Sequence, residues 1–156
     1  MRFRFPALLC LVALHVLPGA ARADDKAQAR VPLLPAYKQE CGSCHTPYPP
    51  GMLPAGSWQR LMNKLGQHYG TDASLDDATQ KQIGTWLAAN AGTYKRVREE
   101  PPQDRITKSA WFIRKHDEVP SAAWTRAAVK TPANCGACHP NASEGAFNEH
   151  DVRIPR

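Results

Sequence analysis

The sequence lacks an apolar run long enough to cross a membrane as a helix, which takes about 20 residues. The longest apolar run, residues 5–17, is shorter; it follows two arginines and precedes the small residues Ala21 and Ala23. A basic start, a short apolar run and a small-x-small site are the parts of a cleaved secretory signal peptide. We therefore expect residues 1–23 to be removed and residues 24–156 to be exported without a transmembrane segment. An uncleaved anchor is the alternative.

The sequence also lacks a basic run interleaved with aromatic side chains, which a nucleic-acid interface would require. The formal net charge of +6 falls to +3 once the three arginines of the signal peptide are removed. The one basic cluster, residues 95–98, is followed at once by Glu99 and Glu100, which is typical of a solvated segment. We therefore expect no nucleic-acid partner.

Two further absences narrow the fold and the chemistry. No stretch shows a convincing alternating pattern of a β-strand, so the chain is expected to be all-α. There is no phosphate loop and no nucleophile–base pair, so the enzyme classes that depend on these features are not indicated.

What the sequence does contain is two C-x-x-C-H motifs, at residues 41–45 and 135–139. In covalent haem attachment the two thiols add to the haem vinyl groups, and the adjacent histidine binds the iron from one face. The two-residue gap places both sulfurs on one side of a single helical turn. The fifth cysteine, Cys10, belongs to the signal peptide, so none is left over. The motifs therefore predict two covalent haem c groups, attached at Cys41, Cys44, Cys135 and Cys138, with His45 and His139 as axial ligands.

Two other uses of four cysteines are possible in principle. They could form two disulfides in an oxidising compartment, or bind one zinc ion as four thiolates. A zinc ribbon usually joins its cysteine pairs by a short knuckle, whereas these pairs lie far apart in the chain. Zinc also gives no reason for a histidine after both pairs, so haem is the favoured reading.

His68 is the candidate for the second axial position in the first half. It follows Leu61 and Leu65 at helical spacing, in an expected helix that Ser57 caps and that stops near Gly70. A histidine on an apolar helical face is usually a core residue. Here an attached haem is the largest apolar object that this face can cover, so we predict ligation.

His116 is the corresponding candidate in the second half. It shares a helical face with Phe112 and Ile113 in an expected helix over residues 106–116. The same argument predicts that His116 binds a haem iron.

Three other side chains compete for the axial positions. His150 lies between acidic residues and is expected at the surface. Met62 shares the expected helix of His68 and is interpreted as a core residue. Met52, in a proline-rich loop, is the more serious rival, because a thioether is a known haem ligand.

The two halves carry motif and ligand in opposite order, so a simple tandem duplication is not indicated. We expect a first haem domain at 24–92, a linker at 93–104 that contains Pro101-Pro102, and a second haem domain at 105–156. Both domains should be of cytochrome c type and packed around the covalent haems, because protein core is scarce at this length. The expected local structures are an extended lead-in over 24–40, a loop over 46–56, a helix from about Leu75 to Asn90 capped by a box at Ser74, and a short helix over 121–129.

Several short segments, the two motifs included, are shared with a known family: Cys41-Gly-Ser-Cys-His45, Tyr48-Pro-Pro, Leu53-Pro-Ala-Gly-Ser-Trp58, His68-Tyr-Gly-Thr-Asp-Ala-Ser-Leu75, Arg105-Ile-Thr107, Trp111-Phe112, His116 and Ala133-Asn-Cys-Gly-Ala-Cys-His139. Through them nearly all of residues 24–156 resembles the small bacterial dihaem cytochromes c, which are periplasmic electron carriers. The resemblance implies two bis-histidine haems, with His68 and His116 as distal ligands. It also implies redox partners such as a membrane b-type cytochrome or a small monohaem cytochrome that binds oxygen.

We therefore expect a periplasmic electron-transfer protein and no enzyme activity. If four histidines fill the four axial positions, neither iron is left open to a substrate. The alternative is a small haem enzyme or a gas-binding sensor with one open haem, which needs a free iron position and polar distal groups.

Overall fold

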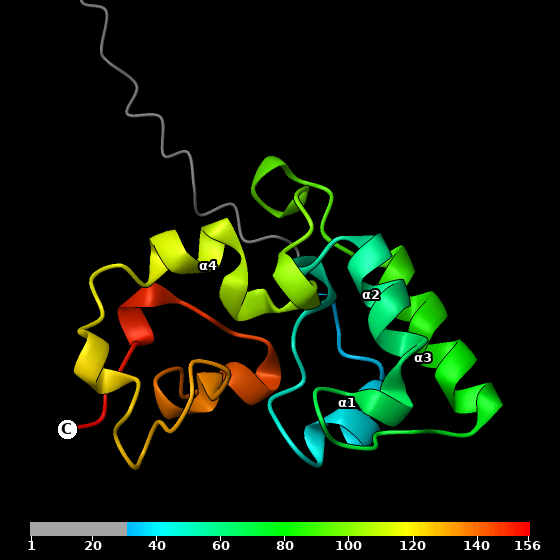
Figure 1. Ribbon diagram of the computed structural model, residues 1–156, viewed down its shortest axis with the longest axis horizontal. Coiled ribbons are helices and arrows are strands. Elements are labelled where there is room, and N and C mark those ends of the chain that lie inside the picture. Colours follow the sequence, from blue (N-terminus) through cyan, green and yellow to red (C-terminus); the bar gives the residue numbers. More distant parts are fainter. Residues whose placement is uncertain (1–30) are drawn as a thin grey trace, which may run out of the picture.

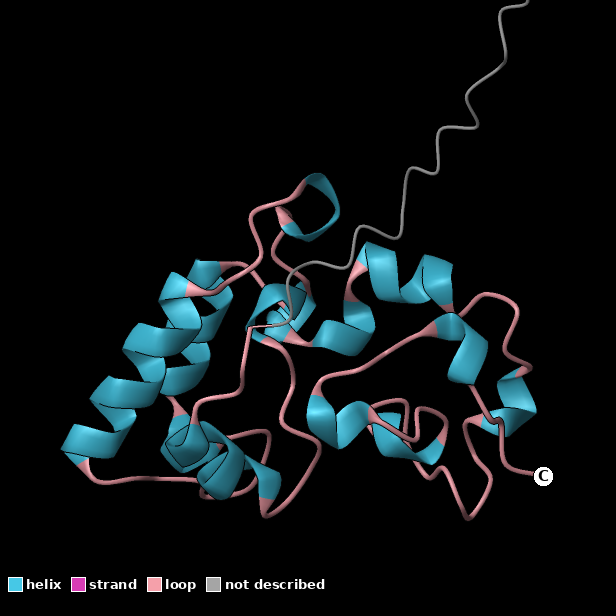
Figure 2. Ribbon diagram, turned by 180° about the vertical axis from the view of Figure 1, so that it is seen from behind, coloured by secondary structure: helices cyan, strands magenta, loops and turns pink. Residues whose placement is uncertain are grey.

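A computed structural model describes residues 31–156, and this part of the chain contains helices and loops but no β-strand (Figure 2). The expected all-α fold is confirmed for these residues. The expected signal peptide, with Cys10, lies outside the described residues. No helix in residues 31–156 has the length and apolar character that a membrane crossing requires.

Helix α1 (Pro35–Gly42) carries the first cysteine of the first motif. Pro35 occupies its first turn, where the fixed φ of proline suits a helix and the missing N–H is not needed. The extended lead-in expected up to residue 40 is therefore wrong from Pro35 onward. Tyr37 of this helix is buried, and its ring lies 5.1 Å from the ring of Trp86.

Helix α2 (Ala55–Met62) starts two residues before Ser57 and ends well short of the predicted end. The end comes at Asn63, whose backbone N–H donates to the Gln59 carbonyl before the chain leaves the helical conformation. His68 is consequently not part of α2. It directly follows the short 3-10 helix η2 (Leu65–Gln67), so the continuous helix expected to carry it is wrong.

Helix α3 (Asp77–Ala89) confirms the expected helix in this region, and it packs along α2 (Figure 1). Its cap is Asp76, whose side chain accepts the backbone N–H groups of Ala78 and Thr79. The capping residue is therefore not Ser74.

Helix α4 (Ala110–Lys115) is the α-helix of the second half, opposite α1–α3 in Figure 1. Ser109 caps it by accepting the N–H of Phe112, so the helix begins four residues later than expected. The short helix expected over 121–129 is reduced to one 3-10 turn and further turns. The 3-10 helices of the described chain are η1 (Pro50–Met52), η2 (Leu65–Gln67), η3 (Lys95–Val97), η4 (Pro102–Asp104), η5 (Ile106–Lys108), η6 (Ser121–Ala123), η7 (Cys135–Ala137), η8 (Ala142–Glu144) and η9 (Glu149–Asp151).

The protein core lies in the first half, between α1, α2 and α3. Its buried hydrophobic side chains are Tyr37, Leu53, Trp58, Met62, Leu65, Ile83 and Leu87. In the second half the buried hydrophobic residues are Phe112, Ala123, Val129 and Ala142. This small set suits a domain that completes its core with a large apolar group.

The segment 93–104 packs against the first half. Val97 in η3 is buried, and η3 also contacts α4. The solvated segment expected over residues 95–98 therefore contains a core residue.

Candidate haem sites

Each C-x-x-C-H motif closes into a single turn of backbone. The N–H of His45 donates to the Cys41 carbonyl at 3.4 Å, and the N–H of His139 donates to the Cys135 carbonyl at 2.9 Å. The first motif continues α1, and the second forms η7. Both histidines therefore follow their cysteines on one turn, as covalent attachment requires.

The histidine of the first motif faces His68. The centroids of the two imidazole rings lie 6.2 Å apart, and the ring planes differ by 20°. The two residues come from different elements, since His45 follows α1 whereas His68 follows η2.

The histidine of the second motif lies opposite His116 at the same distance, but with a different ring orientation. The ring centroids of His116 and His139 also lie 6.2 Å apart, with an interplanar angle of 76°. His116 ends α4, and its ring stacks on Phe112 with centroids 4.0 Å apart. Ile113, which was expected on the same face as His116, is exposed instead.

The spacing in both pairs suits one metal ion between two imidazoles. A bond of about 2 Å from each nitrogen to a metal places the ring centroids about 6 Å apart. The structure thus brings the four predicted axial histidines together as two pairs, which matches two irons with two histidines each.

One histidine in each pair is oriented by the backbone. Nδ1 of His45 lies 2.7 Å from the carbonyl oxygen of Thr46, and Nδ1 of His116 lies 2.8 Å from that of Phe112. A carbonyl oxygen only accepts, so Nδ1 carries the proton in both rings. This leaves the Nε2 lone pair of His45 and His116 available to a metal.

The other histidine of each pair has a buried ring nitrogen without a partner. Among residues 31–156, Nδ1 of His68, Nδ1 of His139 and Nε1 of Trp111 are buried side-chain nitrogens that make no hydrogen bond. Such groups are costly, so they indicate sites built around a group that the polypeptide does not supply. Burial lowers the pKa of His68 and of His139, and the facing histidine lowers each further. Both rings are therefore held neutral, as iron ligation requires.

The four cysteine thiols are free. Burial raises the pKa of Cys41 and of Cys135 to about 11, so these thiols carry their protons at neutral pH. A redox-active or nucleophilic cysteine pair has a lowered pKa instead. Within residues 31–156 no three His, Cys, Asp or Glu side chains gather as ligands of a metal ion. The two cysteine pairs thus form separate sites, and the arrangement fits thioether formation better than a zinc site with four thiolates.

The backbone after His68 is held by residues 103–105, where the expected linker meets the expected second domain. Tyr69 has a left-handed backbone with φ of 52°, which is uncommon for a bulky residue. Its hydroxyl donates to the carbonyl of Gln103 at 2.9 Å, and the guanidinium of Arg105 lies 3.9 Å above its ring. These contacts fix Tyr69, and with it the adjacent His68.

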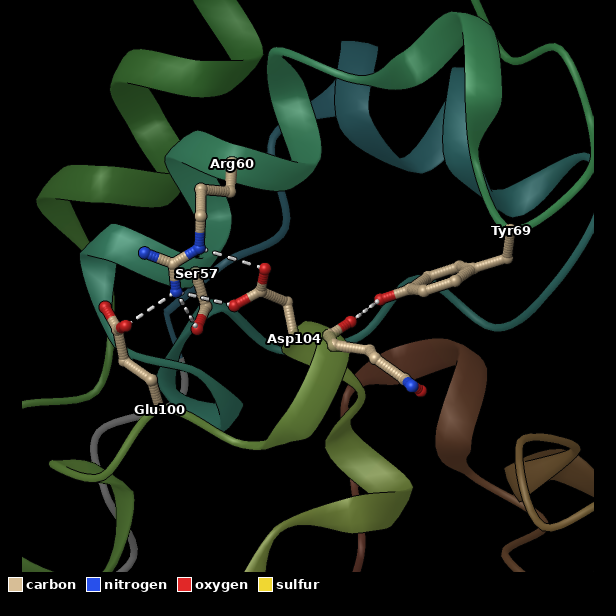
Figure 3. Close-up of polar contacts among 6 residues, drawn as sticks. Ser57, Arg60, Tyr69, Glu100 and Asp104 are labelled. Atoms are coloured by element: carbon tan, nitrogen blue, oxygen red, sulfur yellow. Dashed lines mark hydrogen bonds and ion pairs between the residues drawn. The ribbon is translucent and has the colours of Figure 1, made fainter.

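Arg60 of α2 anchors the same segment (Figure 3). Its Nε and Nη2 donate to the two carboxylate oxygens of Asp104 at 3.0 and 2.7 Å, and Nη2 also lies 2.8 Å from Glu100. The hydrogen bonds from Arg60 lower the pKa of Asp104, so this carboxylate stays charged. Sequence reasoning missed this network, because its members lie far apart in the chain.

Two of the three competing ligands take the positions that were expected of them. His150 is exposed and Met62 is buried in the core, as predicted. Met52 is half-buried in η1, so the loop expected over 46–56 is wrong at residues 50–52 and from Ala55, where α2 begins. Two aromatic contacts had not been predicted: Tyr48 stacks on His45, and Phe147 lies against His139.

Comparisons with known proteins agree with this geometry. Residues 37–147 match the family described as dihaem cytochrome c. A search of curated protein sequences gave no significant match.

Three solved structures are similar to this chain. A crystal structure of DHC purified from Rhodobacter sphaeroides is 42% identical with a TM-score of 0.65, and the match covers 75% of this chain and 99% of that one. Another structure, of a diheme cytochrome c from Rhodobacter sphaeroides, is 41% identical with a TM-score of 0.67, covering 76% and 100%. A diheme cytochrome type c from Shewanella baltica is 36% identical with a TM-score of 0.69, covering 80% and 95%.

Proposed function

The chain belongs to the dihaem cytochrome c family, and from this premise we propose that it is a periplasmic electron carrier with two bis-histidine haems. Membership confirms the resemblance seen in the motifs, and it implies two covalently bound haem c groups. The proposal rests on the two histidine pairs, because the rings of each pair are spaced for one iron. The pairs are His45 with His68 and His116 with His139.

The histidine pairs and the adjacent cysteine motifs indicate which residues would hold each haem. Cys41 and Cys44 would attach the first haem, with His45 and His68 as its axial ligands. The second would be attached at Cys135 and Cys138, with His139 and His116 as ligands. A bound haem supplies an iron that gains and loses one electron, and two histidines favour a lower potential than histidine with methionine.

The protein's own part is to keep the ligands still while the charge changes. The carbonyls of Thr46 and Phe112 hold the rings of His45 and His116, and Phe112 stacks on His116. A ligand set that does not move suits fast exchange with a docked partner. Filled axial positions also leave no iron site for peroxide or oxygen.

The donor and acceptor that we propose are other redox proteins, namely a membrane b-type cytochrome and a small monohaem cytochrome. The resemblance to periplasmic carriers supports this choice. The leader-like first 23 residues support export to the periplasm.

The proposal is tested on the protein matured in a cell that attaches haem. Intact mass after acid–acetone extraction should equal residues 24–156 plus two haems. Reduction under carbon monoxide at neutral pH should leave the spectrum almost unchanged, and a second cytochrome should re-oxidise the protein rapidly. A mass that lacks one haem contradicts covalent attachment at both motifs. Full and fast carbon monoxide binding at one haem, together with peroxide turnover, would show an open-haem enzyme or sensor instead.

A further inference from the structure

Tyr48 touches both haem sites with one side chain. It lies three residues after the first motif, and its ring stacks on the ring of His45 with centroids 4.8 Å apart and planes 18° from parallel. Its hydroxyl donates to the carbonyl oxygen of Ala133 at 2.9 Å. Ala133 lies two residues before Cys135, the first attachment residue of the second motif.

The phenol of Tyr48 stays a hydrogen-bond donor. The Ala133 carbonyl oxygen can only accept, so the Tyr48 hydroxyl is the donor of this bond.

The backbone of Tyr48 is itself held from the core of the first half. The hydroxyl of Tyr37 donates to the Tyr48 carbonyl at 2.8 Å, and Tyr37 is buried against Trp86 of α3. Prolines flank Tyr48 on both sides and restrict its backbone. The side chain therefore extends from a rigid base, not from a free loop.

The halves also meet where η3 contacts α4, and the other recorded contacts beside Tyr48 involve small or exposed groups. A Cβ on Gly136 would lie 3.6 Å from the Thr46 hydroxyl, and one on Gly145 would lie 3.7 Å from Pro49. The ion pair between Lys38 and Glu144 is exposed, and such pairs contribute little. Tyr48 is thus the large, hydrogen-bonded side chain of the contact.

We propose that Tyr48 is a positioning residue that fixes the separation of the two haem sites, and thereby the rate at which an electron passes between them. The inference rests on the proposed function. In that step one electron leaves a ferrous iron, which becomes ferric, and reduces the other ferric iron to ferrous. Tyr48 itself is neither oxidised nor deprotonated.

The test uses the mature dihaem protein and three variants. Tyr48→Phe keeps the stacking on His45 and removes the hydroxyl, while Tyr48→Leu removes both. Tyr94→Phe is the matched control, because the Tyr94 hydroxyl also donates to a backbone carbonyl, that of Gly51, but this bond joins the segment 93–104 to the first half and involves no residue of the second. Pulse radiolysis adds one electron per molecule and follows its redistribution between the haems. Hydrogen exchange reports the opening of residues 133–138.

The expected result is slower redistribution in Tyr48→Phe and slower still in Tyr48→Leu, with Tyr94→Phe like the unmodified protein. Loss of one such hydrogen bond should open the contact about five-fold more often, seen as faster exchange in residues 133–138. Haem content and the low-spin spectra should stay unchanged in Tyr48→Phe, which keeps the test valid if Tyr48→Leu does not mature.

Redistribution at the unmodified rate in both Tyr48 variants overturns the inference, and so does an equal slowing in Tyr94→Phe. Neither of these results contradicts the proposed function. That function fails only if the unmodified protein lacks two covalent haems or carries a haem with an open axial position.

Discussion

The ring planes of His45 and His68 lie within 20° of parallel, whereas those of the second pair, His116 and His139, differ by 76°. Both pairs have the same centroid spacing, so the difference is one of ligand orientation alone. Nearly parallel imidazoles on a ferric low-spin iron split its d orbitals more than nearly perpendicular ones do. The two irons should therefore be electronically different.

We accordingly predict two distinct low-spin signals in the EPR spectrum of the oxidised protein. The signal with the larger anisotropy should belong to the His116–His139 pair, because its planes are nearly perpendicular. His68→Ala should remove one signal and His116→Ala the other, each with the appearance of a high-spin or open haem. A single signal, or a methionine-type charge-transfer band, would contradict this assignment.

His150→Ala is the control for these variants. Because His150 is exposed, its replacement should leave both EPR signals unchanged. An open haem in His150→Ala, with none in His116→Ala, would show that the second pair has been assigned wrongly.

A second prediction concerns Ser109, which is buried and caps α4. Its Oγ accepts the N–H of Phe112 at 3.2 Å and donates to the Ile106 carbonyl at 2.7 Å. Ser109→Ala should lower the free energy of unfolding by about 1 kcal/mol, measured with denaturant and circular dichroism. Because α4 carries Phe112 and ends at His116, the EPR signal of the second haem should also broaden.

Asp76→Ala removes the corresponding cap from α3, which carries no haem ligand. It should destabilise the protein and leave the second signal unchanged. A broadened second signal in Asp76→Ala as well would contradict a specific connection between α4 and His116.

A third prediction follows from the carboxylate of Asp104. The hydrogen bonds from Arg60 lower its pKa below the usual value of about 4. The stability that this contributes is fully present above pH 4 and is lost as the pH falls through the lowered pKa of the folded state. Asp104→Asn should therefore show a smaller loss of unfolding free energy between pH 5 and pH 2.

Arg60→Met tests the same contact from the other side. It removes the donor that lowers the pKa, so it should flatten the acid part of the pH profile in the same way. A profile like that of the unmodified protein in both variants would show that Arg60 and Asp104 do not determine acid stability.

The parts of the site that could be predicted from the sequence are those with local signals. Each attachment motif occupies five consecutive residues, and the spacing of His116 from Phe112 is one helical turn that the structure retains. These relationships depend on local backbone geometry alone, so the sequence of neighbouring residues is sufficient to predict them.

The helix limits could not be predicted, because tertiary contacts determine them. The periodic apolar pattern runs through Asn63 without a break, yet the chain turns there and Tyr69 takes a left-handed backbone. That conformation is held by Gln103, in the segment interpreted as a linker, and by Arg105, the first residue of the expected second domain. Nothing in the residues around His68 signals these distant partners. The pairing of His68 with the first motif likewise came from the structure.

The last prediction concerns Gly92, where the turn after α3 passes close to its neighbours. Its N–H donates to the Leu53 carbonyl, and a Cβ there would lie 2.5 Å from the Gly51 carbonyl oxygen and 2.6 Å from Cγ1 of the buried Val97. Neither neighbour can move freely, so Gly92→Ala should cost about 1–3 kcal/mol of unfolding free energy.

Gly84→Ala is the matched control, because a Cβ in this interior position of α3 meets only Met62 at 3.7 Å. Alanine is the better helix former, so that variant should gain about 0.5–1 kcal/mol. Denaturant unfolding of the two variants should thus give changes of opposite sign. An unchanged midpoint for Gly92→Ala would mean that the segment after α3 is not held against Gly51, and the close packing of residues 93–104 on the first half would have to be given up.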